Sequence, residues 1–381
     1  PTLTAAINAY NNSCLAGAVV FELTDANYTE AGSISINAHA EASAANSLTI
    51  RPAGGVTATV TASVANGPII KILGSYITID GSNNGTAGRN LTLVNSNSSM
   101  PNVVWISSSG ATAVNNVSLK NCILINGSNT ATALFVSNGN IPGMPGYFNN
   151  INIHNNSIQK AYIGISAVAV VSSGNGNGLT ISGNDLSATG ANAISYTGIY
   201  VEGVDGATVF NNIIGNFDGS NDENDKCIWI ANSTKNATVS SNRISNLAYA
   251  GTGGYGCHGI YVSTETAAAN VLVVNNAIDN LTGDGWDYDS PFLLDNIMGI
   301  ALIGTQSGIN IYFNSIHLPG STLNELDAMS MGIYLAAGTV ASVRDNIVVN
   351  NLGLLATKGY GSTAIYAAAS GTQFALANHN N

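Results

Sequence analysis

The sequence predicts an all-β chain that folds as a right-handed parallel β-helix with an N-terminal capping segment. Three observations support this. First, a six-residue pattern recurs: an apolar residue, two mostly polar positions, an Asn, any residue and an aliphatic residue, as in residues 273–278. Second, successive Asn of the pattern are 28, 28, 30, 34, 38 and 32 residues apart, the spacing of a solenoid repeat. Third, the apolar residues fall in short β-branched runs, which indicate strands.

The repeated Asn is expected to form a structural ladder. Its seven positions are Asn156, Asn184, Asn212, Asn242, Asn276, Asn314 and Asn346. Equivalent residues of successive coils lie about 4.8 Å apart, so one amide can donate to the next and accept from the one before. Asn also tolerates the left-handed backbone of a corner. Replacement of Asn242, in mid-stack, should therefore cost more than replacement of Asn346, which is placed near the end.

Residues 1–60 differ from the rest and are predicted to hold a cap and the first strands. Leu3, Ala6, Ile7 and Tyr10 share one helical face, with Thr2 or Thr4 as the N-cap. A short helix here would cover the open first coil, whose strand edges would otherwise be exposed. Strands are expected at 19–23 and 48–52. Residues 61–381 are predicted to be the β-helix coils of a longer protein.

Coils between residues 69 and 136 are shorter and less regular. Strands are expected at 77–79, 91–93, 103–106, 117–119 and 133–136. Cys122 takes the ladder position of one coil and could interrupt the stack. Residues 137–147 alternate Gly with Pro142 and Pro145, which predicts a loop leaving the solenoid surface.

Composition argues against several classes of partner. Only 8% of the residues are charged, and the net charge of −11 disfavours nucleic acid and anionic membranes. No apolar run reaches 18 residues, so no membrane insertion is expected. Solubility must come mostly from Asn, Ser, Thr and Gly, which suits a secreted or cell-surface protein.

Parts of the chain resemble known secreted proteins. The segments 1–3, 20–28, 48–60, 76–82 and 311–318 resemble the large secreted right-handed β-helix repeat proteins of the Bacteroidetes cell-surface type. The resemblance covers nearly the whole chain. It implies the fold and a surface location, and it says little about function.

Five long loops follow the Asn motif, at 215–226, 245–256, 279–298, 319–331 and 351–362, and they should share one flank. Aromatic residues in these loops could form a sugar-stacking platform, or they could pack inward and hold the loops down. The candidates for ligand binding are Tyr249, Tyr255, Trp286, Tyr288 and Tyr360. A separate set, Tyr200, Trp229, Tyr261 and Tyr334, is expected to point inward and to be structural.

Two of the loops are acidic. Asp284, Asp287 and Asp289 are candidates for binding Ca²⁺, although their spacing is not that of an EF-hand. A solvated acidic loop is the simpler interpretation. Paired carboxylates could also serve glycoside hydrolysis, which needs two groups at a fixed separation. No other cofactor is predicted.

Catalytic motifs are scarce. The Asp pair and the Arg-Ile-Lys segment of β-helix polygalacturonases are missing, as are the clustered basic residues of pectate lyases. No Gly-rich phosphate loop, Cys/His metal set or nucleophile elbow is present. No residue is therefore assigned a catalytic role, and His258, near Asp287 or Asp289, is the remaining candidate.

Two of the four cysteines, Cys227 and Cys257, could form a disulfide if the corner between them bends. When the coils are aligned, Cys257 falls two residues before Gly259, the residue that stands over Cys227. Stacked positions offset by two residues are near the limit of a disulfide's reach.

The sequence thus predicts a non-catalytic structural or adhesive module that binds polysaccharides or other surface molecules, or that self-associates end to end into an extracellular filament. The alternative is a carbohydrate-active enzyme, a polysaccharide lyase or glycoside hydrolase, that uses the loop flank. The enzyme requires acidic and basic groups that converge on one face.

Overall fold

The predicted fold class is confirmed: a computed structural model shows an all-β chain of three parallel sheets with one α-helix. It describes residues 2–217, 219, 221–286, 293–320, 323, 328–352, 362–369 and 371–381. The chain forms two compact units: unit 1 is Pro1–Leu186 with Gly203–Ala207, and unit 2 is Ser187–Glu202 with Thr208–Asn381. No helix in these ranges is long and apolar enough to span a bilayer.

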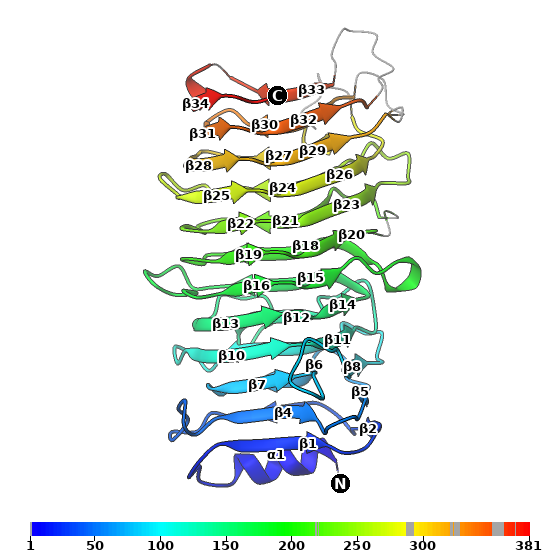
Figure 1. Cartoon of the computed structure of the whole chain (residues 1–381), viewed down its shortest axis with the longest axis vertical. Helices are drawn as coiled ribbons and strands as arrows, with labels where there is room; N and C mark the ends of the chain where they lie inside the picture. The colour runs from blue at the N-terminus through cyan, green and yellow to red at the C-terminus, as the bar shows by residue number, and fades with distance from the viewer. Residues whose placement is uncertain are drawn as a thin grey trace. The chain divides into compact units, whose positions relative to one another are not determined.

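Unit 1 begins with the helix α1 (Leu3–Asn11), which lies beside β1 at the blue end of Figure 1. The order of strands is β1-β4-β7-β10-β13-β16 in sheet A, β2-β5-β8-β11-β14-β17 in sheet B and β3-β6-β9-β12-β15 in sheet C. Each coil therefore contributes one strand to each sheet. The strands are β1 (Val19–Leu23), β2 (Asn27–Thr29), β3 (Ile34–Ile36), β4 (Leu48–Pro52), β5 (Ala58–Ala62), β6 (Pro68–Ile72), β7 (Ile77–Asp80), β8 (Leu91–Asn95), β9 (Asn102–Ser108), β10 (Val114–Lys120), β11 (Cys122–Ile125), β12 (Leu134–Asn138), β13 (Phe148–His154), β14 (Ser157–Gln159), β15 (Ala161–Val168), β16 (Thr180–Ser182) and β17 (Asp185–Leu186).

Unit 2 repeats this plan. Its strand order is β19-β22-β25-β28-β31-β34 in sheet A, β20-β23-β26-β29-β32 in sheet B and β18-β21-β24-β27-β30-β33 in sheet C. Three short 3₁₀ turns, η1 (Gly190–Asn192), η2 (Leu293–Asp295) and η3 (Gly371–Gln373), lie between strands. The strands are β18 (Ile194–Glu202), β19 (Thr208–Phe210), β20 (Ile213–Gly215), β21 (Asp225–Ile230), β22 (Thr238–Ser240), β23 (Arg243–Ala248), β24 (Cys257–Val262), β25 (Val271–Val274), β26 (Ala277–Thr282), β27 (Ile297–Leu302), β28 (Gln306–Tyr312), β29 (Ser315–Leu318), β30 (Ser330–Leu335), β31 (Thr339–Arg344), β32 (Ile347–Asn350), β33 (Thr363–Ala367) and β34 (Phe374–Asn378).

Helix α1 covers the first coil. Thr2 caps it, because its Oγ1 accepts a hydrogen bond from Ala5 N at 3.1 Å. The apolar face buries Leu3, Ile7 and Tyr10. The buried carboxylate of Glu30 accepts hydrogen bonds from the backbone N–H of Leu3 and Thr4, which places a negative charge at the positive end of the helix dipole.

The Asn side chains stack at the corner between sheets A and B. In unit 1, Asn156 Nδ2 donates to Asn184 Oδ1 at 3.0 Å. In unit 2 the amides of Asn212, Asn242, Asn276, Asn314, Asn346 and Asn380 form one series, with Nδ2 to Oδ1 distances of 2.9–3.0 Å. From Asn242 to Asn380, each Oδ1 also accepts from the backbone N–H of the preceding ladder residue, for example Asn242 N to Asn276 Oδ1. The ladder therefore ties both side chains and backbone of successive coils.

Asn380 extends the stack beyond the seven positions inferred from the pattern. Its Oδ1 accepts from Asn346 Nδ2, so Asn380 is the last described member of the ladder and Asn346 is the member before it. The step of 34 residues from Asn346 to Asn380 fits the repeat. The six-residue pattern could not include Asn380, because its aliphatic position would be residue 382 and the sequence given ends at Asn381.

The left-handed backbone sits one residue before the ladder Asn, not on it. Positive φ angles between 51° and 63° occur at Asn155, Gly183, Asn211, Ser241, Asn275, Phe313, Asp345 and His379. The ladder side chain can therefore point into the coil while its predecessor turns the corner. The aliphatic residue two positions after each ladder Asn is buried, as at Ile244 and Ile278.

Phe313 is an unfavourable choice for such a corner, because a bulky side chain at φ 56° is strained. The side chain is 56% exposed and has little packing to lose. Phe313→Asn is expected to raise the free energy of unfolding by about 0.5–1 kcal/mol, measured by urea denaturation. Phe313→Ala is the control, because it removes the ring and keeps the strained Cβ. An equal gain in both variants would assign the effect to the exposed ring.

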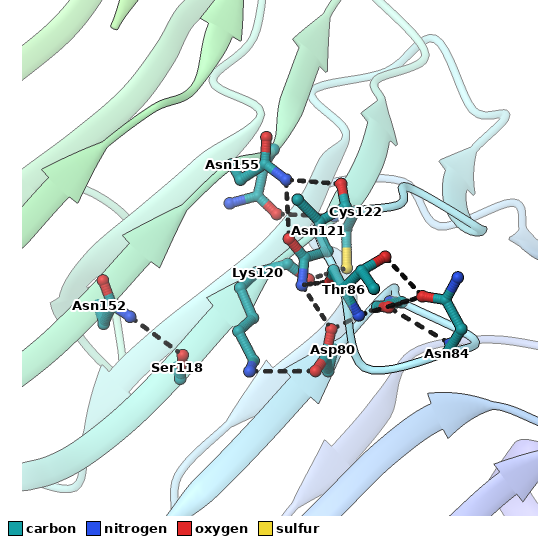
Figure 2. A network of polar contacts seen from close by, with 12 residues as sticks. Asp80, Asn84, Thr86, Ser118, Lys120, Asn121, Cys122, Asn152 and Asn155 are labelled. Atoms are coloured by element: carbon teal, nitrogen blue, oxygen red, sulfur yellow. Dashed lines mark hydrogen bonds and ion pairs between the residues drawn. The ribbon is translucent and has the colours of Figure 1, made fainter. Parts of the chain in front are cut away.

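Where Cys122 replaces the ladder Asn, a second column of polar side chains joins the coils of unit 1. Figure 2 shows Asn155 Nδ2 donating to Asn121 Oδ1 at 2.8 Å, Asn121 Nδ2 donating to Asp80 Oδ1 at 2.7 Å, and Lys120 Nζ paired with Asp80 at 3.0 Å. Asn156 Oδ1 accepts a bond from the Cys122 backbone N–H. The Asn ladder of unit 1 thus begins at Asn156. In the coil before it, Asn121 connects the neighbouring coils through its bonds to Asp80 and Asn155.

Candidate functional site

A groove of about 490 Å³ lies beside sheet C of unit 1. Its size falls within the usual range for small-ligand sites. None of its lining side chains is charged. They are Asn66, Met100, Asn102, Thr130, Ala131, Thr132, Phe135, Pro142 and Tyr162. The groove therefore combines two aromatic rings with amide and hydroxyl groups, and it suits an uncharged ligand with an apolar face.

Phe135 belongs to a column that the repeat creates on sheet C. Lys71, Trp105 and Phe135 pair in register on β6, β9 and β12. The Lys71 ammonium lies 4.2 Å from the centre of the Trp105 ring and donates to Gly139 O at 2.6 Å. Burial lowers the pKa of Lys71. The rings of Trp105 and Phe135 lie 6.4 Å apart. Phe135 thus packs beside the Trp105 ring, and its half-buried side chain lines the groove.

The loop between β12 and β13 forms one wall. It is the excursion expected at residues 137–147, and it folds back so that Asn138 N donates to Met144 O at 2.8 Å. Gly143 has φ 76°, and a Cβ there would come within 3.5 Å of the Phe135 ring. Pro142 consequently lies at the groove with Phe135. The Gly and Pro residues let the loop turn back onto the sheet.

Asn102 supplies a fixed polar group in the lining of the groove. The residue is 4% exposed. Its Nδ2 donates to Pro101 O at 2.9 Å and to Thr132 O at 2.8 Å, which uses both amide hydrogens. The opposite side of the amide, Oδ1, has no donor among the described residues. An acceptor held in this way by a buried residue can receive a hydrogen bond from a ligand without reorienting.

Two residues of the groove adopt left-handed backbone. Asn66 has φ 55° and Met100 has φ 45°, and the segments join where Asn66 N donates to Ser99 O at 2.9 Å. Met100 is a poor residue for this conformation and is 59% exposed. Strained backbone that presents an exposed side chain is often found at binding sites.

Sequence reasoning missed this groove, although a signal existed. Aligning the coils places Trp105 and Phe135 30 residues apart on equivalent strand positions. The aromatic candidates named from the sequence belong to the longest loops, all of which lie in unit 2. The column in unit 1 was therefore overlooked.

The loop aromatics proposed from the sequence are packed against other loops where the structure describes them. Tyr249 is 6% exposed, and its hydroxyl bonds to Asp222 and accepts from Gly253 N. Its ring contacts Tyr255 edge-on at 5.5 Å. The Trp286 ring lies so close to Gly254 that a Cβ there would come within 1.7 Å of it. These rings hold the loops together.

The acidic candidates are only partly described. Asp284 is fully buried, its Oδ2 accepts from Gly254 N at 2.9 Å, and its Oδ1 has no partner among the described residues. Asp287, Asp289, Tyr288 and Tyr360 lie outside those residues. Within the described ranges, no three His, Cys, Asp or Glu side chains converge on a metal position. Of the three Ca²⁺ candidates named from the sequence, only Asp284 lies within the described residues.

Tyr200, Trp229, Tyr261 and Tyr334 do not point inward as expected. Tyr200 bonds to Glu202, two residues along the same face, while the intervening Val201 is fully buried. The four rings are in register along sheet C, and Tyr261 and Tyr334 belong to a cluster with Met298 and Met331. They therefore line the outer face.

A local change in strand alternation explains this reversal. A Cβ at Gly259 would point at Ile278, and the next residue, Ile260, is also fully buried. Two successive residues thus face the core, so Tyr261 turns outward. The paired register skips the glycine position on each of these strands, as at Gly259 and Gly299.

Lys226 and His258 lie among these outer rings. The Lys226 ammonium is 4.9 Å from the Trp229 ring and 5.3 Å from the Tyr261 ring, and it donates to Tyr196 Oη at 3.3 Å. Burial lowers the pKa of Lys226 to about 8, against the opposing effect of nearby carboxylates. Burial raises the pKa of Tyr196 to about 12.

His258 is fully buried and neutral. Burial, reinforced by the Lys226 charge, lowers the pKa of His258 to about 3. Its Nε2 lies 3.0 Å from Leu294 O, so Nε2 carries the proton and Nδ1 is bare. The imidazole is enclosed by packing, which makes it a poor candidate for the catalytic role considered from the sequence.

Cys227 and Cys257 are free thiols, so the disulfide between them is not formed. The register pairs Cys257 with Asp225, and the Cys257 thiol is directed to the carbonyl oxygens of Leu247 and Thr282. The two-residue offset is not closed by a bend. Burial raises the pKa of both thiols above their usual range.

Comparison with known proteins yields likenesses at low identity. The enzymatically active domain of tailspike protein 2 of bacteriophage CBA120 is 10% identical, with a TM-score of 0.46 over 88% of this chain and 47% of that one. This chain thus spans about half the length of that domain. The A-modules of the mannuronan C-5 epimerases AlgE4 and AlgE6 of Azotobacter vinelandii are 13% and 10% identical, with TM-scores of 0.47 and 0.35. The comparison with the AlgE4 module covers 99% of this chain and 95% of that module. The comparison with the AlgE6 module covers 97% of this chain and 94% of that module. No protein-family model and no curated protein matches the chain. The chemistry of the site therefore rests on its own residues.

Proposed function

We propose that this chain is a secreted or cell-surface β-helix module that binds uncharged glycans through the groove of unit 1. One observation carries the proposal: a groove of about 490 Å³ has Phe135 and Tyr162 beside amide and hydroxyl groups, with no charged side chain in its lining. Sugar rings present one apolar C–H face and a rim of hydroxyls, which match aromatic faces and polar side chains. A charge content of 8% suits a surface that functions outside the cell.

Phe135→Ala is expected to weaken glycan binding by about tenfold, because the variant loses the ring face that the sugar would cover. Titration calorimetry with neutral oligosaccharides chosen from a glycan array would measure the change. Phe313→Ala is the matched control, since Phe313 is an exposed aromatic residue that does not line the groove. Equal affinities for the wild type, Phe135→Ala and the control would remove the groove as the binding site.

A carbohydrate-active enzyme is the second candidate, and one observation in unit 2 favours it. Lys226 has a pKa of about 8 and contacts the Tyr196 hydroxyl at 3.3 Å, a pair that could transfer a proton near neutral pH. If this is correct, a panel of acidic and neutral polysaccharides will show turnover by the wild type, and Lys226→Met and Tyr196→Phe will abolish it. The absence of new reducing ends or unsaturated products across the panel would reject the enzyme.

A further inference from the structure

We propose that the groove of unit 1 selects glycans that carry an acetamido group, as in an N-acetylhexosamine. This inference rests on the proposed glycan-binding function and specifies its ligand. An acetamido group has three distinct parts, an N–H donor, a carbonyl acceptor and a methyl group. The groove has a counterpart for each.

The N–H donor matches Asn102. Because Pro101 O and Thr132 O hold both hydrogens of its Nδ2, the amide cannot rotate to offer a donor, and Oδ1 is presented as an acceptor. A ligand carboxylate or carbonyl oxygen at this point would face another acceptor, Asn102 Oδ1, and the two oxygens would repel each other. An amide N–H, which donates and never accepts, fits a fixed acceptor best.

The carbonyl and the methyl group match the surrounding wall. Thr132 lines the groove together with Asn102, and its hydroxyl is the group that we assign to the ligand carbonyl, to which it can donate. Ala131 and Phe135 provide apolar area for a methyl group, and Met100 adds a flexible, polarisable side chain. A plain hexose would place a hydroxyl over this apolar surface instead, and that hydroxyl would lose hydrogen bonds to water.

Charge excludes two related ligands. A uronate would bring a carboxylate to a lining that contains no Lys or Arg, and a free amino sugar would bring an ammonium to a lining that contains no Asp or Glu. The neutral acetamido form avoids both costs. The geometry therefore distinguishes N-acetylated sugars from their de-N-acetylated and oxidised relatives.

The test compares matched ligands by titration calorimetry on the full chain. The panel contains three tetramers with the same β-1,4 linkage, built from N-acetylglucosamine, glucose or de-N-acetylated glucosamine. It also contains N-acetylgalactosamine and galactose. We expect at least one N-acetylated member to bind about tenfold more tightly than its plain and de-N-acetylated partners, as one extra hydrogen bond and a buried methyl group allow.

Thr132→Val isolates the acetamido contact, because Val keeps the shape and removes only the hydroxyl. It should lower affinity for the N-acetylated ligand about fivefold and leave the plain hexose within about twofold. An unchanged thermal melting curve would show that the fold is retained, and Thr130→Val, on the same wall, is a second variant if it is not. Similar affinities for all neutral sugars, lost in Phe135→Ala, would overturn the acetamido inference and leave the proposed function standing. No binding by any member would overturn the acetamido inference, and no binding by any neutral oligosaccharide of the glycan array would overturn the proposed function as well.

Discussion

Asn276→Ala is expected to lower the free energy of unfolding by about 3–5 kcal/mol, because it breaks the middle of the ladder in unit 2. Asn276 Oδ1 accepts from the backbone N–H and from Nδ2 of Asn242, and its own Nδ2 donates to Val239 O and Asn314 Oδ1. All of these groups are buried, so Ala leaves several of them without a partner and without water. Guanidinium denaturation followed by circular dichroism would measure the loss.

Asn380→Ala is the control at the end of the same series. Asn380 is only partly buried, and its amide bonds to Asn346 and Val343 on one side alone. Water can replace part of these bonds, so the expected cost is about 1 kcal/mol. If Asn276→Ala and Asn380→Ala were equally destabilising, stacking along the ladder would not be the source of the stability.

His258→Gln is expected to make the chain less sensitive to acid. The pKa of His258 is about 3 in the folded protein and 6.5 when exposed. Between these pH values the imidazole is protonated in the unfolded chain and neutral in the folded chain. Stability linked to this group is therefore complete above pH 6.5 and is lost as the pH falls toward 3. At about pH 4.5 the wild type should have lost about 2–3 kcal/mol through His258.

Gln removes the titration and keeps a donor that can reach Leu294 O, the partner of His258 Nε2. Urea unfolding of both proteins at about pH 7.5, 5.5 and 4.5 gives the comparison. As the pH falls, the unfolding free energy of the wild type should decrease more than that of His258→Gln. Parallel curves would mean that His258 is protonated readily in the folded state, which would contradict its burial.

The glycan-binding proposal and the predictions for Asn276 and His258 involve different units of the molecule. The groove is lined by residues between Asn66 and Tyr162 in unit 1, whereas Asn276 and His258 lie in unit 2. A stability variant at Asn276 or His258 therefore changes no residue of the groove lining. This separation makes Phe313→Ala a suitable control for Phe135→Ala.

Sequence alone determined the coil and its period. From Asn156 onward the Asn and the aliphatic residue keep their offset, because these coils place an amide at the corner and an apolar side chain in the core. Both requirements are local, so they appear in the sequence as a pattern. Strands at Val19–Leu23 and Leu48–Pro52, and the helix face of Leu3, Ile7 and Tyr10, were predictable for the same reason.

Tertiary structure decided which face each side chain occupies and which polar groups remain for a ligand. Tyr261 faces outward because two successive residues before it, Gly259 and Ile260, both face the core, and simple alternation gives the opposite side. Asn102 presents an acceptor because Pro101 and the more distant Thr132 hold its two hydrogens. The repeated pattern in the sequence determines the coils of the β-helix. Its groove depends on contacts between residues from different coils, about 30 positions apart in the chain.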